Sequence, residues 1–105
     1  MSSKFSFSKV RENDELTYII TGRVDTETAP QLDSDIKPEL NSIKKLVLDL
    51  SGVEYISSSG LRVLLNLNKS LSANKGKFVI RNPSQMVNDV FEITNFSNIL
   101  NIENK

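Results

Sequence analysis

The N-terminal part of the chain alternates apolar and polar residues in a pattern typical of β-strands. Phe5, Phe7 and Val10 stand among polar residues at a spacing close to two, and residues 16–21 (LTYIIT) form a β-rich run. Residues 12–15 (ENDE) have the composition of a turn. The pattern predicts an edge strand followed by its hairpin partner.

A short apolar run at residues 46–50 (LVLDL) is rich in branched side chains, as in strands that are covered on both faces. Ser51 and Gly52 interrupt it, and the apolar patch at residues 53–56 (VEYI) is too short to predict another element. From Leu61 onward, leucines recur at helical spacing. We expect the buried face of this helix to carry Leu61, Leu64, Leu65 and Leu71, with Val63 and Leu67 at its margin.

Two more helices are predicted, one on each side of this central segment. Apolar residues at 29, 32, 36 and 40 form a helical stripe with Thr28 as a candidate N-cap, and Pro38 should kink that helix or end it near Lys37. In the second helix, Asn82 is the candidate N-cap, with Pro83 at the first position and Gln85 at the third.

Strands at residues 77–81 (KFVIR) and within 96–102 complete the pattern. The predicted order is β-β-α-β-α-β-α-β, and the length of 105 residues fits one domain. Alternating strands and helices favour parallel pairing through right-handed crossovers. We therefore expect residues 1–105 to form a single α/β domain with a mixed, mostly parallel sheet and an N-terminal β-hairpin.

The composition excludes several classes of function. The chain has no cysteine and no histidine, which excludes disulfide scaffolds, thiol nucleophiles, histidine triads and the usual zinc sites. Thirteen basic and thirteen acidic residues cancel, which disfavours nucleic acid as a partner. No apolar run reaches the length of a membrane span. We expect a cytoplasmic protein that is not an enzyme and uses no metal, no cofactor, no nucleic acid and no membrane.

Three serines and a glycine, Ser57, Ser58, Ser59 and Gly60, lie between the central strand and its helix. The first turn of a helix has N–H groups without partners and the positive end of the helix dipole. A serine at this position can simply cap the helix, and its hydroxyl can also carry a phosphate without unfolding it. The residues alone leave both interpretations open, and capping is the commoner role.

Other candidate sites have ordinary explanations. Asp49 could act as an acid or a metal ligand, but no second carboxylate has a matching spacing, so we expect it to serve the nearby turn. The serine run lacks the spaced glycines and the lysine of a nucleotide-binding P-loop. Asp25 follows the end of a strand that should neighbour the central one. It is an ordinary loop acid unless the fold brings it to the serines.

Taken together, the motifs resemble STAS domains of the anti-sigma factor antagonist family. The resemblance extends over nearly the whole chain and includes residues 21–25 (TGRVD), 49–53 (DLSGV), 58–61 (SSGL) and 81–84 (RNPS). Each motif alone is weak, but the combination is specific. The resemblance implies a STAS-type fold for the domain predicted above.

Members of this family are binding modules controlled by phosphorylation. The unphosphorylated form binds an anti-sigma factor that is also a serine kinase, and so releases a sigma factor. Phosphorylation of the serine before Gly-Leu breaks that complex, and a serine phosphatase restores it. The resemblance assigns the phosphate to Ser59, with Ser58 as the alternative acceptor. It also implies a partner surface that includes Gly22, Asp25, Ser57, Ser58, Gly60 and Leu61.

The chain departs from the family pattern in two places. Family members often carry an acidic residue two positions before the phosphoacceptor, where this chain has Ser57. Longer members also have a helix after the last strand, for which this chain has little room. Without that helix the sheet would be less covered on one side, which would favour a partner or a weak homodimer there. A second function stays open, a constitutive STAS scaffold in a signalling or transport assembly, with Ser59 only as a cap.

Overall fold

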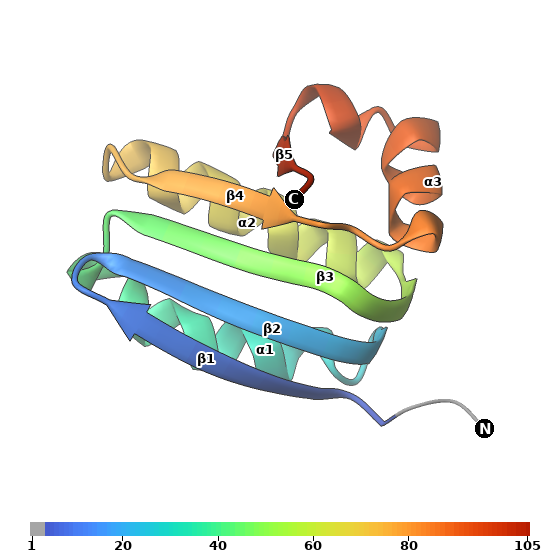
Figure 1. The fold of residues 1–105 in the computed structure, drawn as a ribbon, viewed down its shortest axis with the longest axis horizontal. Coiled ribbons are helices and arrows are strands. Elements are labelled where there is room, and N and C mark those ends of the chain that lie inside the picture. The colour runs from blue at the N-terminus through green and yellow to red at the C-terminus, as the bar shows by residue number, and fades with distance from the viewer. Residues whose placement is uncertain (1–3) are drawn as a thin grey trace.

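Residues 4–105, which the computed structural model describes, form a five-stranded sheet with three α-helices (Figure 1). The strands are β1 (Ser6–Glu12), β2 (Glu15–Val24), β3 (Lys45–Ile56), β4 (Lys77–Arg81) and β5 (Asn101–Glu103). The helices are α1 (Ala29–Ile36), α2 (Ser58–Ala73) and α3 (Gln85–Ile93), with 3-10 helices at Lys37–Ser42 and Phe96–Asn98.

The strands lie in the order β1-β2-β3-β4-β5. β1 pairs with β2 antiparallel, and β2 to β5 pair in parallel. This topology confirms the predicted α/β fold, including the hairpin at the antiparallel edge. The parallel arrangement brings the carboxyl ends of β2 and β3 to the same edge of the sheet, where α1 and α2 begin.

The helices cover the sheet unevenly. α1 and α2 pack on one face, α3 lies near the carboxyl ends of β3 and β4, and the opposite face carries no helix in the described residues (Figure 1). Val10 and Ile19 on that open face remain 52% and 42% exposed. Phe5 and Phe7 instead pack against the core. Grouping Val10 with them was wrong, because an odd spacing along a strand reverses the face. A homodimer through the open face stays a prediction.

The buried stripe of α2 differs from the predicted one. It consists of Gly60, Leu61, Leu64, Leu67 and Leu71, whereas Leu65 is only half-buried. Leu67 is 1% exposed because steps of three and four residues from Leu64 and to Leu71 keep it on the same face. The prediction that placed Leu65 on this face and Leu67 at its margin was wrong.

β3 continues through the apolar patch that the sequence analysis had set aside. The strand runs to Ile56, with register shifts against β2 between Ile19 and Thr21 and between Gly22 and Arg23. Such bulges let a strand absorb an extra residue without ending. The carboxylate of Asp49 accepts hydrogen bonds from the Ser51 backbone (3.0 Å) and hydroxyl (2.7 Å) at the first irregularity. Asp49 thus bonds to the residue two positions on, but at a bulge inside β3 and not at the turn that the sequence analysis expected.

The two other helices begin and end for identifiable reasons. α1 ends at Ile36, and the chain continues as a 3-10 helix that contains Pro38, as predicted. The side chain of Thr28 does not cap α1. The N-cap of α3 is Ser84, whose hydroxyl accepts from the Val87 N–H (3.3 Å), so the prediction of Asn82 was wrong. Asn82 instead adopts a φ of 49° in the preceding turn, which an asparagine tolerates.

A polar cluster fastens the hairpin to α1. The hydroxyl of Tyr18, on β2, donates a hydrogen bond to the carboxylate of Asp35, which also accepts from Lys9 Nζ at 3.0 Å. The Tyr18 hydrogen bond, followed by that of Lys9, lowers the pKa of Asp35. Burial and the same carboxylate raise the pKa of Tyr18. Tyr18 thus combines a fully buried ring with a satisfied hydroxyl.

Candidate functional site

The predicted site lies where β3 passes into α2. The Ser57 N–H donates to the Val24 carbonyl oxygen at 2.9 Å, which joins the carboxyl ends of β3 and β2. Ser57 is the N-cap of α2, and its hydroxyl accepts from the Gly60 N–H at 3.3 Å. Capping is therefore the role of the first serine in the run. We call residues 57–60 the serine loop.

Ser58 and Ser59 occupy the first turn of α2 and are not its cap. Ser58 is exposed and Ser59 is half-buried. Both lie at the positive end of a helix of 16 residues. The sequence analysis predicted a helix that starts at the serines with Ser59 outside the core, and the structure has this geometry. Which of the two carries a phosphate stays a prediction.

Gly60 allows α2 to approach the sheet. A Cβ on Gly60 would lie 2.7 Å from Ile56 Cγ1 and 2.9 Å from Val24 Cγ1. Leu61 beside it is only 9% exposed. Both residues were predicted to touch a partner, but the structure places them in the packing beneath the loop. Their packing fixes the start of α2, where Ser58 and Ser59 lie.

The loop between β2 and α1 lies beside the serine loop and is built around Asp25. Its carboxylate accepts hydrogen bonds from the backbone N–H groups of Glu27 (3.0 Å) and Thr28 (3.1 Å). These bonds, led by that of Thr28, lower the pKa of Asp25. The structure thus brings Asp25 to the predicted site, where it organises its own loop. We call residues 22–28, which comprise the last three residues of β2 and the turn after them, the β2–α1 loop.

Gly22, the other predicted residue of this loop, is buried and has a φ of 91°. A Cβ there would lie 2.6 Å from the backbone oxygen of Lys4. Only glycine meets both requirements without strain. Gly22 therefore shapes the end of β2 and presents no side chain to a partner.

Sequence analysis missed a pair of residues at this edge, Arg23 and Tyr55. The guanidinium carbon of Arg23 lies 4.2 Å from the centroid of the Tyr55 ring. The two residues are register partners on β2 and β3. No signal in the sequence pairs them, because their register depends on both bulges in β3 and on its extension to Ile56.

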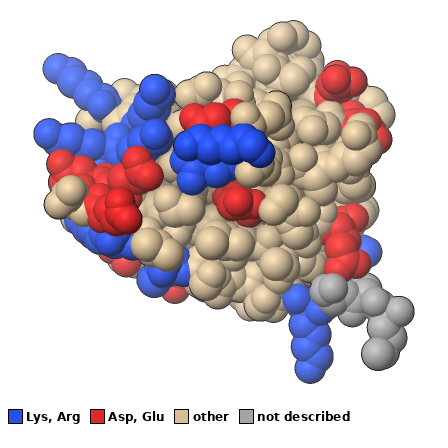
Figure 2. Space-filling view, viewed as in Figure 1, with Lys and Arg blue, Asp and Glu red and all other residues tan. Residues whose placement is uncertain are grey.

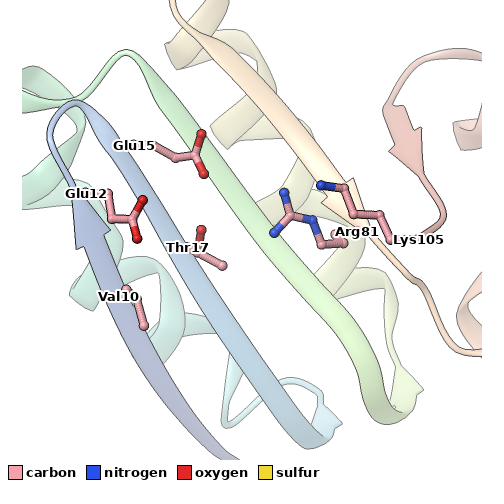
Figure 3. Close-up of a pocket in the computed structure, with 6 residues that line it drawn as sticks. All are labelled: Val10, Glu12, Glu15, Thr17, Arg81 and Lys105. Carbon is pink, nitrogen blue, oxygen red and sulfur yellow. The ribbon is translucent and has the colours of Figure 1, made fainter.

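The open face of the sheet has a shallow hollow that lies away from the serines. Its volume is about 360 Å³, and Figure 3 shows the residues that line it: Val10, Glu12, Glu15, Thr17, Arg81 and Lys105. Charged side chains of both signs are interspersed over this face (Figure 2). Because acids and bases mix here and the hollow is only half enclosed, it does not point to one class of ligand.

Among residues 4–105, no group of three or more acidic side chains is arranged to hold a metal ion. No helix in the same range has both the length and the apolar character that crossing a membrane requires.

Comparisons with known proteins agree with this fold. The family model of the STAS domain matches residues 7–105. The anti-sigma-B factor antagonist of Listeria monocytogenes is 32% identical over 99 residues, which cover 91% of this chain and 85% of that protein.

Among solved structures, an anti-sigma factor antagonist from Mycobacterium paratuberculosis has a TM-score of 0.85 at 23% identity and covers 98% of this chain and 90% of its own. SpoIIAA of Bacillus in its unphosphorylated form has a TM-score of 0.80 at 18% identity, covering 94% and 87%. These two likenesses concern the fold. The match over residues 7–105 and the Listeria relative show that the chain belongs to the STAS domain family of anti-sigma factor antagonists.

Proposed function

We propose that this chain is an anti-sigma factor antagonist whose docking is switched off by phosphorylation. Its unphosphorylated form binds an anti-sigma factor that is also a serine kinase, and so frees a sigma factor. Phosphorylation of Ser59 ends the binding, and a serine phosphatase restores it. Such partners would place the protein in the cytoplasm. The observation that supports this most is the position of Ser58 and Ser59, outside the core and free of the capping role that Ser57 takes.

The fold should tolerate the phosphate. A phosphoserine carries a charge of about −1.5 to −2 at neutral pH. In the first turn of α2 the helix dipole stabilises such a charge by roughly 0.3–1 kcal/mol. The Ser57 cap and the packing of Gly60 and Leu61 hold the helix start in place without either hydroxyl. Modification should therefore leave the structure intact.

Docking to the partner should not tolerate the phosphate. At an interface the dianion loses water without gaining a cation built to receive it, which costs several kcal/mol per unpaired ion. A loss of about 3 kcal/mol lowers the affinity roughly a hundredfold. The interface effect is larger than the gain from the dipole, so phosphorylation should act on binding and leave the fold unchanged.

Known proteins of this family offer a parallel. SpoIIAA has been solved in a phosphorylated form, which has a TM-score of 0.75 to this chain at 17% identity. A STAS fold can thus hold a phosphate and remain folded. We place the phosphate on Ser59 because it directly precedes Gly60 and Leu61, with Ser58 as the alternative.

The test is to incubate the purified chain with each serine kinase of the anti-sigma type encoded in its source genome, and to map the modified residue by mass spectrometry. We expect one phosphate on Ser59 in the wild type and none in Ser59→Ala. Ser58→Ala is the matched control and should be modified normally. If no kinase modifies the wild type and no phosphorylated form occurs in cells, the chain is instead a constitutive STAS scaffold.

A further inference from the structure

Arg23 lies near the carboxyl end of β2, on the open face of the sheet, and its side chain packs against an aromatic ring. Its guanidinium carbon is 4.2 Å from the Tyr55 ring centroid, close enough for a cation–π contact. The next pair in the register is Val24 and Ile56, and the Ser57 N–H donates to Val24. The backbone of Arg23 therefore lies about two residues, roughly 7 Å of strand, from the serine loop. Its side chain is on the face opposite Val24, at the edge of the sheet where both loops lie.

The fold makes little use of the positive charge of Arg23. The side chain is 48% exposed, and its Nε lies 3.7 Å from Asp25 Oδ2, too far for a hydrogen bond. The other carboxylate oxygen of Asp25 is committed to the backbone N–H groups of Glu27 and Thr28. An exposed ion pair of this kind contributes little to stability.

We infer that Arg23, whose side chain packs against the Tyr55 ring, binds a carboxylate side chain of the partner at this surface. The inference rests on the proposed function, because it concerns the same docking surface, formed by the serine loop and the β2–α1 loop. The planar guanidinium can receive a carboxylate through two parallel hydrogen bonds. Arginine and tyrosine are also the residue types most often found at the energetic centre of interfaces.

Pre-ordering separates Arg23 from other cations near the site. Docking has to immobilise a flexible side chain, which weakens binding. The Tyr55 ring already restricts Arg23, and Asp25 attracts it on one edge. Arg62 on α2 is exposed and has no comparable contact within the described residues. A partner with an acidic side chain opposite Arg23 thus gains a charged contact at a smaller loss of side-chain entropy.

The test measures the dissociation constant of the complex with the serine kinase that binds the wild type, by titration calorimetry at two salt concentrations. Arg23→Gln should lower the affinity about tenfold or more at low salt, and the difference should shrink at high salt. Tyr55→Phe keeps the ring and should bind normally, whereas Tyr55→Leu should weaken binding several-fold. Lys77→Gln, which removes an exposed charge at the start of β4, is the matched control.

The outcomes separate this inference from the proposed function. If the dissociation constant of Arg23→Gln is within about twofold of the wild-type value while Ser59→Asp loses binding, the inference about Arg23 is wrong and the phosphorylation switch stands. If Ser59→Asp binds as tightly as the wild type, the switch is wrong whatever Arg23 does. A wild-type chain that binds none of the kinases contradicts both. Circular dichroism is used to check that each variant is folded. Arg23→Lys, which keeps the charge but not the planar group, should give an affinity between those of the wild type and Arg23→Gln.

Discussion

The contact between α2 and the sheet leaves no room for a methyl group at Gly60. A Cβ there would lie 2.7 Å from Ile56 Cγ1, 2.9 Å from Val24 Cγ1 and 3.1 Å from the Val24 carbonyl oxygen. Val24 and Ile56 are only 2% and 4% exposed, so neither can move into solvent. In Gly60→Ala, either α2 shifts outward or buried side chains leave their preferred rotamers.

Two opposing effects set the change in the free energy of unfolding expected for Gly60→Ala. Overpacking of a core costs about 1–3 kcal/mol. Replacing glycine by alanine in a helix returns up to about 1 kcal/mol. We therefore expect Gly60→Ala to lower the free energy of unfolding by about 1–2 kcal/mol, with each kcal/mol lowering Tm by roughly 4–8 °C.

The assay is thermal and urea unfolding followed by circular dichroism, with Asn66→Ala as the control. Asn66 is exposed on the same helix, so its replacement reports helix propensity alone and should leave stability equal or slightly higher. A Gly60→Ala variant as stable as Asn66→Ala would refute the close approach. Since the shift would move Ser58 and Ser59, Gly60→Ala should also weaken docking.

Three further predictions concern the cap, the end of α2 and the hairpin. Ser57→Ala should lower the free energy of unfolding by about 1 kcal/mol, while Ser57→Asp, which can still cap, should not. Lys75 follows α2 with a φ of 60°, so Lys75→Gly should stabilise the protein by about 0.5–1 kcal/mol in urea unfolding. Tyr18→Phe removes the hydrogen bond to Asp35 and should cost about 1 kcal/mol at neutral pH. Because that bond lowers the pKa of Asp35, its contribution is full above the ordinary value of 3.8 and is lost as the pH falls through the lowered pKa, so wild type and Tyr18→Phe should converge in acid.

The order of elements could be predicted from the sequence because its strongest signals are local. The apolar run at residues 46–50, the leucine spacing after it and the effect of Pro38 each act within a few residues. One error arose where tertiary packing decides, because the bulges that carry β3 to Ile56 depend on pairing with β2. The placement of Leu67 at the margin was a different kind of error, because its spacing from Leu64 and to Leu71 already puts it on the buried face.

Only part of the candidate site could be predicted from the sequence. The serine loop could be located from the sequence, because a strand followed by serines and a helix places them at the edge of the sheet. The sequence could not predict which serine caps α2, because Ser57, Ser58 and Ser59 are chemically equal until the helix start is fixed. The Arg23 and Tyr55 contact lies beyond sequence reasoning for a similar reason, because it needs the register of two strands that are far apart in the chain.

The central claim is that one phosphate abolishes docking while the fold survives. The most direct measurement compares the affinity of the unphosphorylated chain and of the chain fully phosphorylated on Ser59 for the same kinase, together with their unfolding curves. We predict an affinity loss of roughly a hundredfold, with a change in unfolding free energy of no more than about 1 kcal/mol. Equal affinities, or a phosphorylated chain that has unfolded, would contradict the account.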